Sequence, residues 1–342
     1  MASKKHEGIP AVFWHLSGFY ENEINLLKYT EMKKIILILF TLLTINPGLK
    51  INAQTPVANT TNEKLMICIF SKHLQFLDYK TLGEKVSEMG FDGIDLTVRE
   101  GGHVEPTKVK TDLRKAVTEI EKAGSKVIMI ATTIENAGNS EDVDVLSAAA
   151  QCGIKYYRAN WFKYPEGKTL PESLEKYAVQ IKDLSMLNKK TGIIGCYQNH
   201  AGNLVGGSLW EVYSILGLAD PQYFGAQYDI RHAMVEGANS WVNGLELIHS
   251  RIKTIVVKDY KWELINGKWQ IVNVPIGEGM VDFKKFFHLL KSYHINVPVS
   301  LHCEYDLGGA EKGNRQIKVD PQVVYDAMKK DLIKIQQLWK ES

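Results

Sequence analysis

From Leu65 onward the sequence alternates eight times between a short apolar run and a segment with helical spacing. This rhythm is typical of a parallel sheet covered by helices, because each helix carries the chain back to begin the next parallel strand. The predicted strands are Leu65 to Phe70, Gly93 to Val98, Lys126 to Thr132, Lys155 to Trp161, Ile193 to Gln198, Phe224 to Ile230, Thr254 to Lys258 and Pro298 to Cys303. Eight such units close a barrel, so the sequence predicts a single-domain (β/α)8 barrel.

Helical spacing fills the intervals between these runs. The predicted helices are Tyr79 to Met89, Val109 to Ala123, Val143 to Cys152, Leu174 to Asn188, Leu209 to Leu216, Trp241 to His249, Phe283 to His294 and Pro321 to Lys340. Asp320 before Pro321 is a helix-start signal, and Gly90 and Gly124 are stop signals. The segment Lys261 to Asn273 breaks the rhythm and predicts a β-hairpin after the seventh strand, turning at Asn266-Gly267.

The N-terminal part of the chain has a different character. Residues 32–53 resemble a secretory signal, with Met32-Lys-Lys34 before the apolar run Ile35 to Ile45 and Ile51-Asn-Ala53 at a cleavage pattern. The run is too short for a membrane-spanning helix, so we expect cleavage, no stable membrane anchor, and export to a bacterial periplasm. Residues 1–31 are interpreted as an upstream extension, residues 54–63 as a linker and residues 64–342 as the barrel.

Charge and cysteine content narrow the function further. The formal net charge is +2 and becomes zero after cleavage at Ala53, so the chain has no field that would attract nucleic acid. No glycine-rich phosphate cradle stands out in the sequence, so a phosphorylated substrate is not favoured for an exported chain. No nucleotide cofactor is expected. The four cysteines follow neither a disulfide nor a zinc pattern, and we expect free thiols.

Several predicted strands end in polar residues, although the strands of a buried parallel sheet normally carry apolar side chains. Buried charges need solvent, a partner or a ligand, and the carboxyl ends of barrel strands are where this architecture places its chemistry. Because side chains alternate across a strand, residues of one parity share a face. The following residues are therefore expected to face inward: Asp95, Thr97, Arg99, Tyr156, Arg158, Asn160, Cys196, Gln198, Gln227, Asp229, Lys258, Ser300, His302 and Glu304.

Several of these positions allow alternatives. Gln198 and Asn160 could equally bond to loop backbone. Asp229 and His232 stand three residues apart, which fits an Asx-turn as well as a carboxylate and imidazole pair that serves a ligand, and we favour the second. An inward Lys258 must either pair with Asp229 or Glu304 or lose its proton, and both outcomes suit catalysis.

Taken together, the strand-end motifs resemble one known family. They are Gln198-Asn-His-Ala-Gly202, Gln227-Tyr-Asp-Ile-Arg-His-Ala233, Val257-Lys-Asp259, Pro275-Ile-Gly-Glu-Gly-Met-Val-Asp-Phe283 and Ser300-Leu-His-Cys-Glu-Tyr-Asp306. Their order and spacing are similar to the sugar phosphate isomerase/epimerase branch of the xylose-isomerase-like TIM barrels, from about Leu65 to Trp339. The resemblance implies a barrel that acts on sugars or polyols, often with one divalent metal.

The resemblance also implies four ligand positions: Glu on the fifth strand, Asp of an Asp-x-x-His motif on the sixth, His on the seventh and Glu on the eighth. In this chain Gln198 stands at the first position, Asp229 keeps the second, Val256 takes the third, and His302 or Glu304 the fourth. Two positions depart, because an amide is a weaker ligand and valine is none.

Two hypotheses for the centre therefore stay open. In one, a divalent metal (Mn, Mg, Co or Zn) is held by Asp229, His302 and Glu304. In the other, the chemistry is metal-free and Lys258 neutralises an enolate in the metal's place.

The leading functional hypothesis is an exported isomerase, epimerase or lyase that removes a proton next to the carbonyl of a keto-sugar or polyol. This chemistry needs a base, here Glu304 or His200, and a positive group at the enolate oxygen, here Lys258 or a metal. The predicted substrate-binding residues are Gln198, His232, Arg158, Asn160, His103, Glu100 and Gln227.

Two alternatives are weighed against this hypothesis. A nuclease like endonuclease IV, which shares the superfamily, is disfavoured by the neutral charge and the departing ligand positions. A degenerate barrel that only binds sugar would explain those departures without any catalysis.

Overall fold

The computed structural model describes residues 64–342, which belong to one compact unit that begins at Asn62. The predictions made for residues 1–31, 32–53 and 54–63 lie outside the described residues and stay predictions. Within the described part, no helix is long and apolar enough to cross a membrane.

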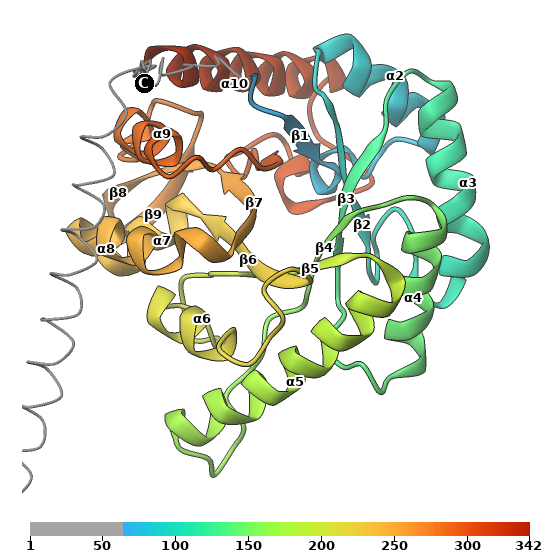
Figure 1. The fold of residues 1–342 in the computed structure, drawn as a ribbon. Helices are drawn as coiled ribbons and strands as arrows, with labels where there is room; N and C mark the ends of the chain where they lie inside the picture. The colour runs from blue at the N-terminus through green and yellow to red at the C-terminus, as the bar shows by residue number, and fades with distance from the viewer. Residues whose placement is uncertain (1–63) are drawn as a thin grey trace, which may run out of the picture. The chain divides into compact units, whose positions relative to one another are not determined.

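Eight parallel strands form a closed barrel, which confirms the predicted fold (Figure 1). The barrel strands are β1 (Ile67–Phe70), β2 (Gly93–Val98), β3 (Val127–Thr132), β4 (Tyr156–Arg158), β5 (Ile194–Gln198), β6 (Phe224–Asp229), β7 (Ile252–Val257) and β10 (Val299–Leu301). They follow one another around the ring in chain order, and β10 closes it by pairing with β1 and β7. Every predicted strand is present within a few residues of its expected bounds.

Helices surround this ring (Figure 1). They are α2 (Tyr79–Met89), α3 (Val109–Lys122), α4 (Ser140–Gln151), α5 (Leu170–Thr191), α6 (Leu209–Ile215), α7 (Ile230–Gly237), α8 (Trp241–Ile248), α9 (Phe283–Ser292) and α10 (Pro321–Glu341), with short 3-10 turns η1 (Ser71–Leu74), η2 (Pro106–Lys108), η3 (Ala238–Ser240), η4 (His249–Arg251) and η5 (Ala310–Lys312). The expected signals operate: the Asp320 side chain caps α10, and Gly90 ends α2 with φ 92°. Helix α7 was not predicted, because it follows Asp229 at the end of β6 without any loop between strand and helix.

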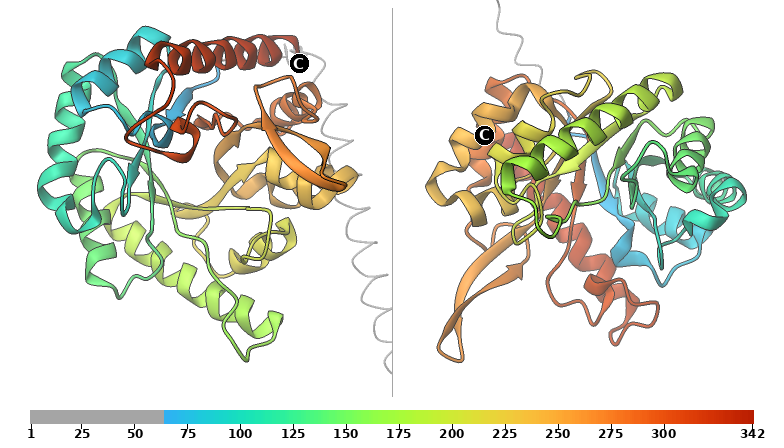
Figure 2. Two further views of the ribbon diagram at one scale, coloured as in Figure 1. Left: turned by 180° about the vertical axis from the view of Figure 1, so that it is seen from behind. Right: turned by 90° about the horizontal axis from the view of Figure 1, so that it is seen from below.

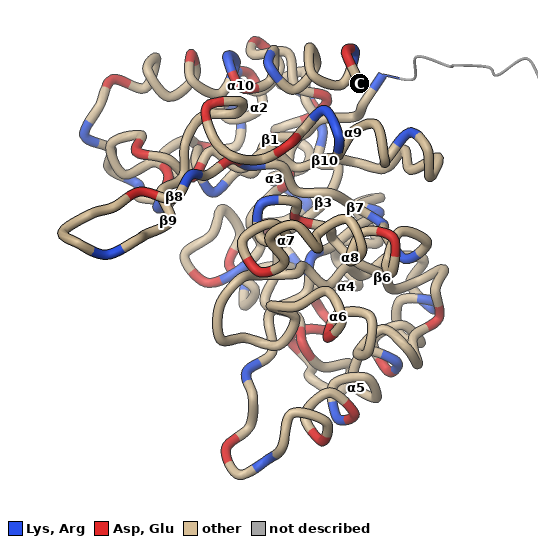
Figure 3. The backbone as a smooth tube through the Cα atoms, turned by 90° about the vertical axis from the view of Figure 1, so that its left-hand side faces the viewer, with Lys and Arg blue, Asp and Glu red and all other residues tan. Residues whose placement is uncertain are grey.

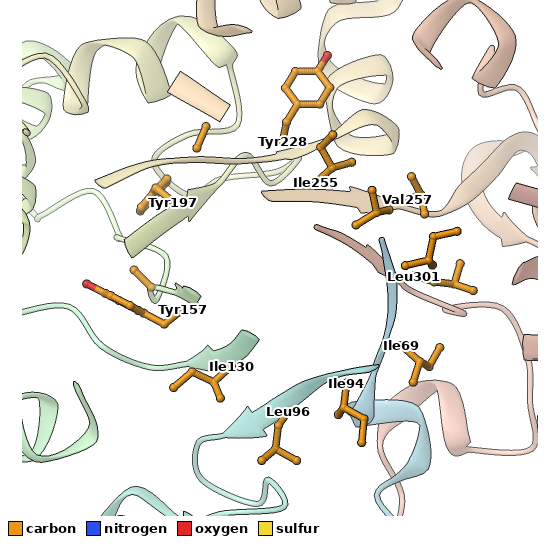
Figure 4. Packing of buried hydrophobic residues seen from close by; sticks show 14 of the residues in the cluster. Ile69, Ile94, Leu96, Ile130, Tyr157, Tyr197, Tyr228, Ile255, Val257 and Leu301 are labelled. Carbon is orange, nitrogen blue, oxygen red and sulfur yellow. The ribbon is translucent and has the colours of Figure 1, made fainter. Parts of the chain in front are cut away.

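The alternation of side chains decides what lies on each side of the barrel wall. Apolar side chains such as Leu96, Tyr157 and Tyr228 point outward and pack beneath the helices (Figure 4). Their neighbours in sequence therefore point into the barrel, which confirms the predicted inward parity. The helices thus cover the apolar face of each strand, and the polar residues are left to the barrel interior and its mouth.

A two-stranded hairpin follows the seventh barrel strand, as predicted. Strands β8 (Asp259–Ile265) and β9 (Lys268–Val274) pair in antiparallel register and project from the barrel (Figure 2). Asn266 and Gly267 form the turn with positive φ values of 52° and 76°, the geometry that an Asn-Gly turn supplies at low cost. At its base, the buried Asp259 carboxylate accepts backbone N–H groups of Tyr260, Gly277, Gly279 and Val281, which ties the two ends of the insertion together.

Charge and thiols also agree with the sequence. In the view of Figure 3, Lys and Arg are interspersed with Asp and Glu, and neither sign dominates. All four cysteines are free, which confirms that prediction.

Candidate functional site

A cavity of about 190 Å³ lies at the carboxyl ends of the barrel strands. It is lined by Phe70, Lys72, Arg99, Arg158, Trp161, Gln198, His200, Lys258, His302 and Glu304. Strand ends from both halves of the ring contribute to it, and this is the position where barrels of this architecture hold their active sites.

Lys258, the residue after β7, is the centre of the polar cluster. Its ammonium Nζ lies 3.2 Å from Asp229 Oδ2 and 3.1 Å from Glu304 Oε2. The side chain is only 3% exposed, and Asp229 is fully buried. The prediction that an inward lysine would pair with Asp229 or Glu304 is confirmed, and it pairs with both.

The two carboxylate oxygens of Asp229 make different contacts. Oδ1 accepts the backbone N–H of His232 and caps helix α7, so the Asx-type capping considered for this spacing is present. Oδ2 faces Lys258 and accepts a 2.9 Å hydrogen bond from Gln198 Nε2. Asn199 fixes the backbone of Asp229 by accepting from its N–H and donating to its carbonyl. The carboxylate is therefore held rigidly while it holds Lys258.

A neutral imidazole flanks the cluster. His232 Nε2 lies 2.9 Å from Lys258 Nζ, and Nδ1 lies 3.0 Å from Arg231 Nη1. Burial, followed by the charge of Lys258, lowers the pKa of His232 well below its ordinary value, so the ring stays uncharged. The His200 ring lies tilted beside it, with ring centroids 4.1 Å apart, and its centroid is 4.6 Å from that of Trp161.

Glu304 is the acid that reaches the cavity. Its side chain is 23% exposed, whereas the Asp229 side chain is fully buried. Burial alone would raise the pKa of Glu304, but the Lys258 ammonium and the His302 contact outweigh it, and the pKa lies well below its ordinary value. His302 stacks on Phe70 at 4.2 Å, and burial lowers its own pKa to about 4. At neutral pH the cavity thus presents a carboxylate beside an ammonium and a neutral imidazole.

Six predicted site residues do not line the cavity. Asp229 and His232 contact Lys258, and the other four have different surroundings. Asn160 donates instead to Glu135 Oε1 on the rim, and Gln227 lies in the barrel interior against Met129. His103 is anchored by two hydrogen bonds to the Thr97 hydroxyl. Glu100, in the same loop, is exposed to solvent. Parity fixed the direction of a side chain but not its height in the barrel, and the two loop residues had no such constraint.

Other lining residues were not among the predicted site residues. Arg99 shares the inward parity of Asp95 and lies directly after β2, so parity alone could have identified it. Lys72 lies in η1, where no periodic signal marks a side chain as inward. Phe70 and Trp161 form apolar walls of the cavity.

Beneath the cavity, the buried carboxyl of Asp95 makes stability depend on pH. Ser300 Oγ donates to Oδ2 at 2.7 Å, Oδ1 has no hydrogen-bond partner within the described residues, and burial raises the pKa of Asp95 to about 6. Since this folded-state pKa exceeds the ordinary value, the contribution to stability is full below about pH 4 and is lost as the pH rises through about 6.

Asp95→Asn removes this loss, because the amide cannot ionise. We expect the free energy of unfolding of the variant, relative to that of the wild type, to rise by about 3 kcal/mol between pH 4 and pH 7. Denaturant titrations at a series of pH values measure this difference. A difference that stays constant with pH would contradict the assignment.

Comparison with known proteins agrees with this architecture. The family model described as "Xylose isomerase-like TIM barrel" matches residues 84–324, which is more than half of the chain. The chain belongs to the xylose isomerase-like TIM barrel family. The sequence resemblance to this family is thereby confirmed. A search of curated proteins finds no match.

Solved structures with the same fold include several sugar enzymes. The 3-keto-D-glucoside 4-epimerase YcjR from E. coli has a TM-score of 0.58 and 15% identity, covering 79% of this chain and all of its own. A D-psicose 3-epimerase from Clostridium cellulolyticum H10 has a TM-score of 0.61 and 13% identity, covering 80% and 99%. The IolI protein with a bound zinc atom has a TM-score of 0.63 and 16% identity, also covering 80% and 99%. At such identities the likeness shows the xylose isomerase-like fold.

The donor set at the centre of this family member does not fit a divalent metal. Among residues 64–342, no three His, Cys, Asp or Glu side chains form a group that could hold a metal ion, so the predicted set of Asp229, His302 and Glu304 is not assembled. The Lys258 ammonium already lies between the two carboxylates. Val256, which pairs in register with Asp229, offers only hydrocarbon. A second cation at this point would meet the repulsion of the first.

Proposed function

We propose that the chain is an isomerase, epimerase or lyase that moves a proton next to the carbonyl group of a keto-sugar or polyol. One observation carries the proposal: an ammonium and a carboxylate that contact each other at 3.1 Å both line a single cavity at the barrel mouth. A base and a positive group side by side are what proton abstraction next to a carbonyl requires.

Glu304 is the proposed base. It is ionised at neutral pH, and it is the acidic side chain that lines the cavity within the described residues. Its lowered pKa depends on the contact with Lys258, so it rises when the ammonium turns toward a substrate oxygen. The carboxylate therefore becomes a stronger base when the substrate is in place.

Lys258 is the proposed group that stabilises the enolate oxygen. Its ammonium is held by contacts with Asp229 and His232, and Gln198 in turn holds the Asp229 carboxylate. Because these contacts exist before any substrate binds, little reorganisation is needed when negative charge develops on the substrate. Preorganised donors of this kind typically contribute 10²- to 10³-fold to kcat, on the order of 3 kcal/mol. His200 and Arg158 complete the cavity wall and are placed to bind polar groups of the substrate.

The proposed chemistry uses Lys258 in the position where the resemblance led us to consider a divalent cation. The ammonium supplies one positive charge between Asp229 and Glu304 without any coordination by oxygen ligands. It can donate a proton as well as a hydrogen bond, so the same group can reprotonate an enediolate from one side.

A substrate screen tests this function. Keto-sugars and sugar alcohols are incubated with the full chain, and products are followed by mass change and by exchange of substrate protons for deuterium from the solvent. We expect exchange at a carbon next to a carbonyl, at the same rate with and without a chelator. Metal content of the purified chain, measured by atomic mass spectrometry, should be far below one ion per chain.

Each failure has a distinct meaning. Binding without exchange across the panel would leave only a sugar-binding barrel. Exchange that a chelator abolishes and a divalent cation restores would overturn the role proposed for Lys258.

A further inference from the structure

The cavity has two chemically different halves. Strands β5, β6, β7 and β10 form one arc of the barrel and carry the cluster of Asp229, Lys258 and Glu304. The other arc, β1 to β4, carries three cations that line the same cavity. They are Lys72 in η1 after β1, Arg99 directly after β2, and Arg158 at the end of β4.

These three cations have no anionic partner in the described part of the chain. None forms an ion pair with a carboxylate of residues 64–342, whereas Lys258 forms two. Glu304 attracts Lys72 and Arg99 at longer range, but its carboxylate is already in contact with Lys258. On one arc the charge of Lys258 is therefore balanced by carboxylates in direct contact with it, whereas the three cations of the other arc have no such contact.

Arg158 shows the imbalance most clearly. The residue is 4% exposed, and the guanidinium has only two long hydrogen bonds of 3.4 Å, to the carbonyls of Ala159 and Thr132, and a stacking contact of 4.2 Å with Trp161. Burial lowers its pKa to about 10. A buried guanidinium without a counterion is costly, and its planar fork of donors fits the two oxygens of a carboxylate or phosphate.

Asp95 is the carboxyl that attracts Arg99 and Arg158 from the barrel interior, and it offsets only part of the positive charge. It accepts from Ser300 and forms no ion pair with Arg99 or Arg158. Even where it is ionised, one carboxylate sets a single negative charge against three cations. A ligand is needed to supply the rest of the counter-charge.

We propose that the ligand is a monosaccharide bearing an anionic group, a carboxylate or a phosphate, which binds Lys72, Arg99 and Arg158 while its carbonyl end lies against Lys258 and Glu304. The cavity is small, at about 190 Å³, which favours a single sugar ring over a longer chain. Calling this ligand a substrate rests on the proposed function, but its binding does not.

Calorimetric titration of the full chain with matched ligands tests the inference. The probes are D-glucuronate, D-glucose 6-phosphate and neutral D-glucose. We expect one or both anionic sugars to bind at least about 10-fold more tightly than D-glucose, and the advantage to shrink as salt is added. Whichever anion binds more tightly identifies the group. Equal affinities for all three probes would overturn the proposal.

Variants then locate the effect. Arg158→Met should remove most of the preference for the anion, and because it deletes an uncompensated buried charge, its melting temperature should stay equal or rise. A purely structural arginine would instead give a lower melting temperature and an unchanged preference. Arg99→Gln, at a half-buried position, gives a second test, and Arg114→Gln on the exposed surface of α3 is the matched control that should keep the preference.

Turnover separates this inference from the proposed function. If neutral and anionic keto-sugars react with equal kcat/KM, the enzyme proposal stands and the anionic substrate class falls. If anionic sugars bind preferentially but never exchange a proton, the binding site stands and the enzyme proposal falls.

Discussion

Replacing Glu304 with glutamine is expected to lower kcat by about 10²- to 10⁴-fold, the contribution typical of a general base. The amide keeps the shape of the side chain and can still accept a hydrogen bond from Lys258, which now contacts Oε2 at 3.1 Å. We therefore expect KM and the melting temperature to change little. Steady-state kinetics on a substrate identified by the deuterium-exchange screen, together with a thermal melt, check this result.

A rim acid supplies the matched control. Glu135 holds Asn160 at 2.7 Å but does not line the cavity, so Glu135→Gln should leave kcat within a few-fold of the wild type. If Glu304→Gln behaved like Glu135→Gln, Glu304 would not be the base.

Lys258→Met is expected to have the largest effect on stability. The change leaves the fully buried Asp229 carboxylate without its cation, and breaking a buried ion pair by removing one partner costs about 3–5 kcal/mol. Denaturant titration measures the loss. Turnover should also disappear, since the enolate oxygen loses its positive partner.

A double-mutant cycle tests whether the cost comes from the unpaired charge. In Lys258→Met combined with Asp229→Asn, no buried carboxylate is left at this point, so the double variant should be more stable than the sum of the single losses implies. The exposed pair of Lys330 and Glu278, at 2.9 Å, is the control, and Lys330→Met should cost less than about 1 kcal/mol. Additive losses in the buried pair would show that Asp229 and Lys258 do not depend on each other.

Most of the fold could be predicted from periodicity. The eight strands, the hairpin turn at Asn266-Gly267 and the N-cap Asp320 all follow from local rules that tertiary context did not override. Helix α7 was missed because it begins directly at Asp229, which ends β6, and leaves no loop between strand and helix. Asp229 is both the last residue of β6 and the N-cap of α7, so the sequence has no separate residue that marks the start of the helix.

The site could be predicted only in part, for a physical reason. Parity assigned Gln198, Lys258 and Glu304 to the inner face. Gln198 then meets Asp229 of the neighbouring strand β6, and Lys258 meets Glu304 after the neighbouring strand β10. Height along the barrel axis is set by strand length and tilt, so Gln227 ended below the cavity although its parity was right. Residues in irregular turns, such as Lys72, have no periodicity to read.

The ion pairs of Lys258 have a consequence for the conditions under which the chain works. In proteins that bind a divalent metal, other metal ions compete for the site. The affinity of a given site rises along the first-row divalent series toward copper, whichever ion the chemistry needs. The charge of a lysine side chain is covalently part of the protein, so another ion cannot displace it and a chelator cannot remove it. Under the mechanism proposed for Lys258, the chain would carry its reactive groups as soon as it folds.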